Sequence, residues 1–242
     1  MHRAGHDDGV TPSVGEADRT SPRAGGSRAR VRMTGAQRRQ QLLDVGRELF
    51  AQRGYEATSI EEIASRADVS KPVVYEHFGG KEGLYAVVVD REMQRLLDRF
   101  TSALSSGGHP RELLERAALV LLDYIEDETD GFRVLSRDSP VVGTSGTFSS
   151  LIGEVARKVE HILAAQFSTT GYDPRLAELY SQALVGMVAL VGQWWLDTRQ
   201  PDKRQVAAHL VNLAYNGLSG LETRPQLVGR PRLAPSPESP AT

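Results

Sequence analysis

Apolar residues recur at helical spacing from about residue 36 to residue 219, and no segment alternates as a half-buried strand does. One stretch has apolar positions at i, i+3, i+4, i+7 and i+8, namely Leu42, Val45, Gly46, Leu49 and Phe50. A longer stretch carries Tyr85, Val89, Met93, Leu96, Phe100 and Leu104. Nine stretches of this kind, with no strand pattern between them, predict an all-α fold.

Both ends of the sequence lack the apolar residues that a core needs. Residues 1–33 are rich in Gly, Ser, Arg and Asp, and residues 223–242 are rich in Pro. Neither segment can bury enough apolar surface to offset the entropy of ordering, so both are predicted to be disordered tails. Between them we expect a small domain at 34–82 and a larger one at 83–222.

The composition excludes several classes of protein. The chain has no cysteine, so it can form neither disulfides nor thiolate metal sites. Its longest apolar run, residues 183–192, is about half the roughly 18 residues that a membrane-spanning helix needs, so we expect a soluble, cytoplasmic protein. No histidine pair has the spacing of a metal motif and Ser145 is not in a G-x-S-x-G motif, so we expect no metal site, no cofactor and no enzyme.

The charge is divided unevenly along the chain. Residues 28–81 carry 10 Lys and Arg against 7 Asp and Glu, whereas the remainder carries 19 against 24. The formal net charge of −2 therefore conceals a basic N-terminal segment, which is the sign that favours an anionic partner.

A very short helix is predicted within residues 69–85, VSKPVVYEHFGGKEGLY. Ser70 suits the N-cap, and Pro72 suits the first turn, where its missing N–H costs nothing. The pair Gly79-Gly80 then allows a sharp reversal into the next helix.

Another helix precedes this short one. Either Thr58 with Glu61 or Ser59 with Glu62 forms a capping box at its start. Asp68 lies in the tight turn between the two helices, because Asp tolerates the left-handed conformation better than most residues. A short helix after a helix and a tight turn is the helix-turn-helix pattern, whose second helix enters the major groove of DNA.

The outward side of this motif carries the predicted DNA contacts. Tyr75 and His77 can donate hydrogen bonds to phosphate oxygens, and Lys81 adds a positive charge. The amides at the start of the preceding helix can meet a further phosphate. Val74 and Phe78 are expected to face the preceding helices. The predicted DNA contacts are Thr58, Ser59, Ser70, Lys71, Pro72, Val73, Tyr75, His77 and Lys81.

The order and spacing of these residues resemble a known family. The residues that carry the likeness are Phe50-x3-Gly54-Tyr55, Thr58-Ser59-Ile60, Glu62-Ile63-Ala64, Val69-Ser70, Tyr75-x-His77-Phe78 and Lys81-Glu82-x-Leu84. Over residues 36–90 they resemble the DNA-binding region of the TetR family of regulators. One departure is Asp68, where that family commonly has Gly. The resemblance implies that the partner is double-stranded DNA with a pseudo-palindromic operator. It also implies a homodimer in which the last two helices of each protomer form a four-helix interface, with a ligand cavity inside the middle helices.

Within the last part of the chain, Trp194 and Trp195 are adjacent and must face different sides of one helix. One is expected to look into the core or cavity and the other toward a partner. Gly186 and Gly192 are expected to let helices cross closely.

The predicted cavity wall is apolar. Gly131, Pro140, Gly143 and Gly146 interrupt the middle of the chain, where a loop at 139–150 could gate a small apolar ligand. Two basic residues, Arg133 and Arg137, are expected near one mouth, which favours a long apolar ligand with an anionic head. The predicted ligand contacts are Phe100, Leu121, Tyr124, Ile125, Phe132, Leu135, Phe148, Met187 and Trp194.

A narrower likeness concerns the effector. The runs GGKEGLYAVVVDREM, DYIEDETDGFR and QALVGMVALVGQWWL resemble the FasR-type regulators of fatty-acid synthesis, which respond to long-chain acyl-CoA. That resemblance implies a long-chain acyl-CoA as effector.

A basic arm at Arg28, Arg30 and Arg32 could add contacts to DNA. The alternative is a helical lipid-binding or adaptor protein that does not bind DNA.

Overall fold

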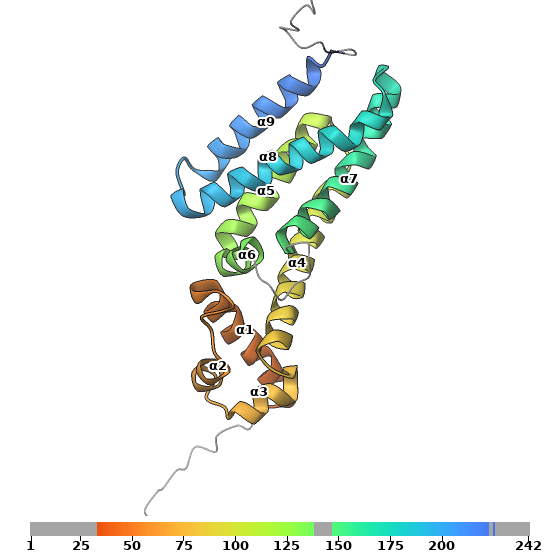
Figure 1. The fold of residues 1–242 in the computed structure, drawn as a ribbon. Coiled ribbons are helices and arrows are strands. Elements are labelled where there is room, and N and C mark those ends of the chain that lie inside the picture. Colours follow the sequence, from red (N-terminus) through yellow and green to blue (C-terminus); the bar gives the residue numbers. More distant parts are fainter. Residues whose placement is uncertain (1–32, 138–146, 223–224, 226–242) are drawn as a thin grey trace, which may run out of the picture. The chain divides into compact units, whose positions relative to one another are not determined.

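The computed structural model of the chain describes residues 33–137, 147–222 and 225, and its secondary structure over these residues is entirely helical (Figure 1). The helices are α1 (Gly35–Arg53), α2 (Ile60–Arg66), α3 (Lys71–Phe78), α4 (Lys81–Ser105), α5 (Pro110–Asp127), α6 (Thr129–Ser136), α7 (Thr147–Thr170), the short 3₁₀ turn η1 (Pro174–Leu176), α8 (Ala177–Thr198) and α9 (Lys203–Ser219). Over the described residues, the prediction of an all-α fold with nine helices is confirmed. Apart from Met33 and Pro225, the predicted tails lie outside the described residues, as does the arm at Arg28, Arg30 and Arg32.

The first four helices share one hydrophobic core. Leu42, Leu49 and Phe50 of α1 pack with Ile63 of α2, Val74 of α3 and residues of the first half of α4. A Cβ added at Gly46 would lie 3.0 Å from Leu84 Cδ2, so the absence of a side chain there allows α1 and α4 to pack closely. This core fixes the position of α2 and α3.

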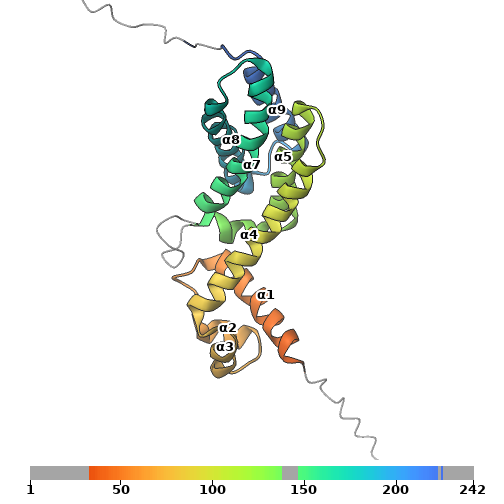
Figure 2. The ribbon, with the colours of Figure 1, turned by 90° about the vertical axis from the view of Figure 1, so that its right-hand side faces the viewer.

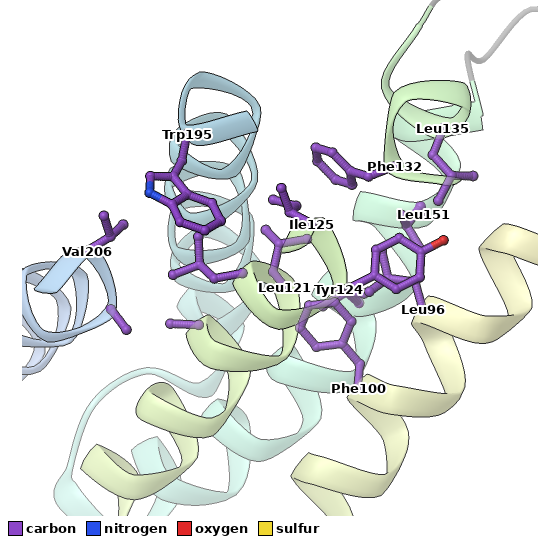
Figure 3. Close-up of a cluster of buried hydrophobic side chains, with 14 of the residues drawn as sticks. Leu96, Phe100, Leu121, Tyr124, Ile125, Phe132, Leu135, Leu151, Trp195 and Val206 are labelled. Atoms are coloured by element: carbon purple, nitrogen blue, oxygen red, sulfur yellow. The ribbon is translucent and has the colours of Figure 1, made fainter. Parts of the chain in front are cut away.

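The second half of α4 belongs to another core, built with α5 to α9. Figures 1 and 2 show α7 beside α8 and α5 beside α9, and the close-up in Figure 3 shows side chains from several of these helices meeting around α5. A Cβ at Gly192 of α8 would lie 2.8 Å from Leu121 Cδ2, which confirms the close crossing predicted there. A Cβ at Gly186 would touch nothing within 4 Å, so no helix of the same protomer crosses at that point.

One boundary differs from the prediction: helix α7 begins at Thr147, inside the segment predicted to be a loop up to Ser150. Near the start of α8, Asp173 accepts a hydrogen bond from the Arg175 amide and caps the 3₁₀ turn, and α8 itself begins at Ala177. Leu213 of α9 is 64% exposed.

The segment Pro174–Thr198, which contains α8, is long and apolar enough to cross a bilayer by length and composition, contrary to the prediction from the shorter run. Only 22% of its most apolar window is buried. Helix α8 packs on α5 and α7, and its other side is exposed.

Candidate nucleic-acid interface and effector pocket

The start of α2 settles the choice between the two predicted caps. Ser59 is the N-cap, and its hydroxyl accepts a hydrogen bond from the Glu62 amide at 3.1 Å. The hydroxyl of Thr58 instead donates to the Gly54 carbonyl at 2.7 Å, and the residue is buried. The Thr58 side chain therefore holds the loop before α2, so a contact from this residue to DNA would have to come from its backbone, and its place among the DNA contacts stays a prediction.

The turn between α2 and α3 forms with Asp68 in the left-handed conformation, at φ 51°. The Asp68 amide donates to the Ser65 carbonyl, and the Val69 amide donates to the Ala64 carbonyl at 2.9 Å. Asp adopts positive φ more readily than most non-glycine residues, so replacing the commonly found Gly leaves the tight turn intact.

Helix α3 presents one side to solvent and buries the other. Val74 is fully buried and Phe78 is half-buried, whereas Tyr75 is 54% exposed. Ser70 occupies the N-cap position without accepting a side-chain cap hydrogen bond. The other predicted contacts on this helix range from exposed (Ser70, Lys71, Pro72) to half-exposed (Val73, His77).

Two glycines with positive φ separate α3 from α4. Gly79 has φ 73° and donates its amide to the Tyr75 carbonyl at 2.8 Å, which ends α3. Gly80 has φ 138°, a conformation that L side chains rarely adopt, and α4 begins at the next residue. The reversal predicted from the glycine pair is thus present, and it puts Lys81 in the first turn of α4.

Both predicted lysine contacts have protein partners in the free chain. Lys71 of α3 forms an ion pair with Glu61 of α2, and this contact lowers the pKa of the Glu61 carboxyl. The ammonium of Lys81 donates to the Tyr55 carbonyl at 3.0 Å and lies 4.2 Å from the centroid of the Tyr55 ring. To bind a phosphate, the Lys71 ammonium would have to leave the Glu61 carboxylate or contact both groups at once.

Sequence reasoning missed Arg39 of α1. Its guanidinium stacks on the Phe78 ring, 4.5 Å from the centroid, and its Nη1 is buried without a hydrogen-bond partner in the described part of the chain. The pairing joins the first helix to the end of α3. Arg39 lies three residues before Leu42 and seven before Gly46, on the same side of α1 as the apolar stripe, and this spacing was the available sign that its side chain packs inward.

Beyond the helix-turn-helix unit, two adjoining apolar chambers lie between α4, α5, α7, α8 and α9. The inner chamber, of about 70 Å³, is lined by Leu96, Phe100, Leu114, Ala117, Leu121, Leu151, Ile152, Val155, Val159, Leu184, Val185, Val188 and Ala189. The outer chamber, of about 740 Å³, is lined by residues that include Leu113, Ile162, Leu163, Phe167, Tyr215 and Leu218. Leu114, Ala117, Val159 and Leu184 line both chambers.

The predicted ligand contacts divide into three groups. Phe100 and Leu121 line the inner chamber. Tyr124, Ile125, Phe132 and Leu135 are fully buried in the adjoining core, as Figure 3 shows, and Met187 packs against that core; none of the five belongs to the chamber walls. The Phe148 side chain lies outside the described residues.

The assignment of Trp194 to the cavity is wrong. Trp194 is 51% exposed, whereas Trp195 is 2% exposed and points toward α5 and α9 in Figure 3. The indole N–H of Trp195 donates to the Pro201 carbonyl at 2.8 Å, which selects it as the inward member of the pair. Arg133 and Arg137 also lie off both chamber walls, and Arg133 is 3.7 Å from the Asp130 carboxylate.

A buried polar cluster, which we call the Glu92 clasp, joins α1, α4 and the α5–α6 region. The carboxylate of Glu92, 2% exposed, accepts a hydrogen bond from the Tyr124 hydroxyl at 2.7 Å and one from Arg95 at 2.6 Å. Arg47 of α1 lies 3.7 Å from the same carboxylate and pairs with Glu128 at 2.6 Å. Because α1 carries the helix-turn-helix unit, the clasp links that unit to the helices around the chambers.

These features define a class of protein. A short exposed helix held by a tight turn on two others, together with a separate apolar chamber along the same α4, makes a helix-turn-helix DNA-binding regulator with an effector domain. Comparison with family models gives the particular family. The model for bacterial regulatory proteins of the tetR family matches residues 42–88, and the model for the tetracyclin repressor-like C-terminal domain matches residues 110–217. The chain belongs to the TetR family of transcription regulators.

Individual relatives agree with this assignment. The HTH-type transcriptional activator FasR of Mycolicibacterium smegmatis is 34% identical over 201 residues, which are 81% of this chain and 90% of that protein. A TetR-like transcriptional regulator from Rhodococcus sp. RHA1 superposes with a TM-score of 0.64 at 28% identity, over 78% of this chain and 100% of its own. A tetR-family regulator from Streptomyces coelicolor gives 0.60 at 30% identity, over 76% of this chain and 81% of its own. The narrower likeness to FasR is confirmed at the level of sequence.

Proposed function

We propose that this TetR-family regulator is a homodimer whose affinity for a pseudo-palindromic operator in the cytoplasm is set by a long, mainly apolar effector. The observation that carries the proposal is the pair of chambers beside α4, which share four lining residues. The outer chamber alone, at about 740 Å³, has the volume of a small-molecule site, for which about 300–1,000 Å³ is usual.

The effector class follows from the lining and from the FasR resemblance together. Aliphatic and aromatic carbon forms the inner chamber, which at about 70 Å³ suits the end of a hydrocarbon chain and offers no hydrogen-bond partner to a polar molecule. The resemblance to FasR-type regulators implies a long-chain acyl-CoA, and with it control of genes for fatty-acid synthesis. We therefore propose a long-chain acyl-CoA as the effector.

Helix α4 would carry the signal from effector to DNA. Leu96 and Phe100 of α4 line the inner chamber, and Glu92, one turn before Leu96, is the centre of the clasp that reaches α1. An effector that binds one arrangement of α4 more tightly than another shifts the population between them by that difference in affinity. The same shift moves α3 relative to the α3 of a second protomer.

The proposed dimer face is the uncovered side of α8 and α9. Leu179, Leu190 and Trp194 of α8 and Leu213 of α9 are each more than half exposed. A contiguous apolar surface on a soluble domain marks an interaction site, and two copies of this helix pair would bury it in a four-helix interface. The same face accounts for the low burial of α8.

Gel shifts with upstream genomic fragments, over a salt series and with added hexadecanoyl-CoA, test the proposal. We expect a fragment-selective shift that weakens steeply as salt rises, because counterions are released from phosphates. Hexadecanoyl-CoA should change the affinity, while CoA alone should not. A shift that ignores every acyl-CoA would leave the DNA-binding regulator intact and refute this effector class.

A further inference from the structure

The two ends of the effector pocket differ chemically. The inner chamber ends against aliphatic and aromatic carbon, whereas the outer chamber also has polar side chains on its wall, among them His109, Gln166 and Tyr215. They come from three different elements: the start of α5, the end of α7 and the end of α9. The pocket is therefore amphipathic, with its polar end at the turn between α4 and α5.

Several of these polar groups have hydrogen-bonding capacity that no other described residue uses. The Tyr215 hydroxyl and the Gln166 amide form no side-chain hydrogen bond in the part of the chain that the structure describes. His109 caps α5 by accepting the Arg111 amide at Nδ1, at 3.3 Å, which leaves its Nε2–H as a donor. By contrast, the Tyr172 hydroxyl already donates to the Leu221 carbonyl at 2.7 Å.

The positively charged side chain of Arg111 lies next to this polar end. The Arg111 guanidinium lies 5.6 Å from the centroid of the Tyr215 ring and pairs with no carboxylate among the described residues. Its neighbour Arg116 is committed to the carbonyls of Ala103 and Gly107. Arg111 is not itself in the chamber wall, but the Tyr215 ring that it contacts is. Arg133, which the sequence suggested for this role, belongs to α6 and pairs with Asp130.

We infer that the polar end of the outer chamber is the site for the anionic head of an amphipathic effector, with Arg111 as its counter-charge and His109, Gln166 and Tyr215 as hydrogen-bond donors. The hydrocarbon chain then runs past Ala117, which lines both chambers, and its end enters the inner chamber. This orientation rests on the proposed apolar effector and adds the direction in which it lies. The head can be the carboxylate of a fatty acid or a phosphate of an acyl-CoA, since both are anionic acceptors of Arg and N–H donors.

The test compares three ligands that share one hydrocarbon chain: hexadecanoyl-CoA, hexadecanoate and methyl hexadecanoate, titrated calorimetrically into the full chain below their micelle concentrations. Arg111→Ala should weaken binding of the anionic ligand or ligands by roughly tenfold, the loss of one charge-assisted hydrogen bond, and leave the methyl ester unchanged. Gln166→Ala should act in the same direction. Arg133→Ala is the matched control and should alter none of the three.

The outcomes separate the site from the effector class. Loss confined to hexadecanoyl-CoA identifies a phosphate-bearing head, and loss confined to hexadecanoate identifies a carboxylate; either supports the site. Weakening by Arg133→Ala but not by Arg111→Ala would reverse the orientation and overturn it, as would equal binding of the charged and neutral ligands. If the wild-type protein bound none of the three ligands, the proposal of a lipid effector would be refuted, and the proposed site for its head group would be refuted as well.

Discussion

Tyr75 can serve DNA binding because the fold does not need it. Its side chain is 54% exposed on α3, while the adjacent Val74 is fully buried in the core shared with α1 and α2. We expect Tyr75→Ala to weaken every operator by about tenfold, through one hydrogen bond to a charged phosphate, and to leave thermal unfolding unchanged. Gel shifts on two operators and a melting curve check this. The exposed neighbour Glu76 changed to Ala is the control and should not weaken binding; an unfolded Tyr75→Ala protein would make Tyr75 a core residue.

Gly131 has a steric reason to be glycine. A Cβ there would lie 2.2 Å from Glu92 Oε2 and 2.8 Å from the Tyr124 hydroxyl oxygen, inside the Glu92 clasp. Gly131→Ala should therefore destabilise the protein by about 1–3 kcal/mol, the range for overpacking a tight interior. Gly153→Ala in α7 is the matched control, since its Cβ would meet nothing within 4 Å, and it should stabilise by about 0.4–1 kcal/mol. Urea unfolding of both variants measures these changes. A Gly131→Ala protein as stable as the unchanged protein would show that the Glu92 clasp can shift to make room for the added methyl group.

Ala117 has the smallest side chain among the four residues that line both chambers. Ala117→Phe should block the way from the outer to the inner chamber and shift the preference from hexadecanoyl-CoA toward octanoyl-CoA, because only the longer chain needs the inner chamber. Leu113→Phe, which lines only the outer chamber, is the control and should weaken both ligands alike. Calorimetric titration across the chain-length series measures the shift. An unchanged length preference would mean that the chain does not pass Ala117.

At the scale of elements, periodicity predicted which helices exist but not which of their polar residues are internal. Glu92 lies three residues after Val89 and four before Leu96, at positions where α4 is buried, and that spacing was the available sign of a buried carboxylate. Its partners Tyr124 and Arg47 are 32 and 45 positions away, so no local pattern could join them. Trp194 and Trp195 illustrate the same limit: adjacency requires opposite faces, but only packing against α5 decides which one is inward.

The contact between α4 and α5 through Tyr124 predicts how stability responds to alkaline pH. Burial and the neighbouring Glu92 carboxylate raise the pKa of the Tyr124 hydroxyl above its ordinary value of about 10. Above that pH the unfolded chain loses a proton that the folded chain keeps, so the free energy of unfolding falls as pH rises. Tyr124→Phe should flatten this decline between about pH 10 and 11, although it removes one hydrogen bond at neutral pH. Urea unfolding across the pH range measures both slopes; identical slopes would contradict the role of Tyr124.

At the scale of the molecule, the proposed function links three features: the DNA-binding helix α3, the effector pocket, and the uncovered face of α8 and α9. A pseudo-palindromic operator presents two half-sites, so a protein with one recognition helix per chain needs a symmetric pair of chains to occupy both. The effector can then act on the distance between the two copies of α3. In the proposed dimer the face of α8 and α9 sets that distance, which makes it the place where a single change should separate assembly from folding.

Leu190→Glu is the change that tests this. Leu190 is 65% exposed in the protomer, so a carboxylate there should leave the monomer folded. In the dimer it would be buried twice in an apolar interface without a partner, and we expect the dimer Kd to rise by about two orders of magnitude. Sedimentation should show a monomer, and binding to a two-half-site operator should fall in parallel, whereas Ala165→Glu on the exposed side of α7 should change neither. A Leu190→Glu protein that remained dimeric and bound the operator normally would place the interface elsewhere.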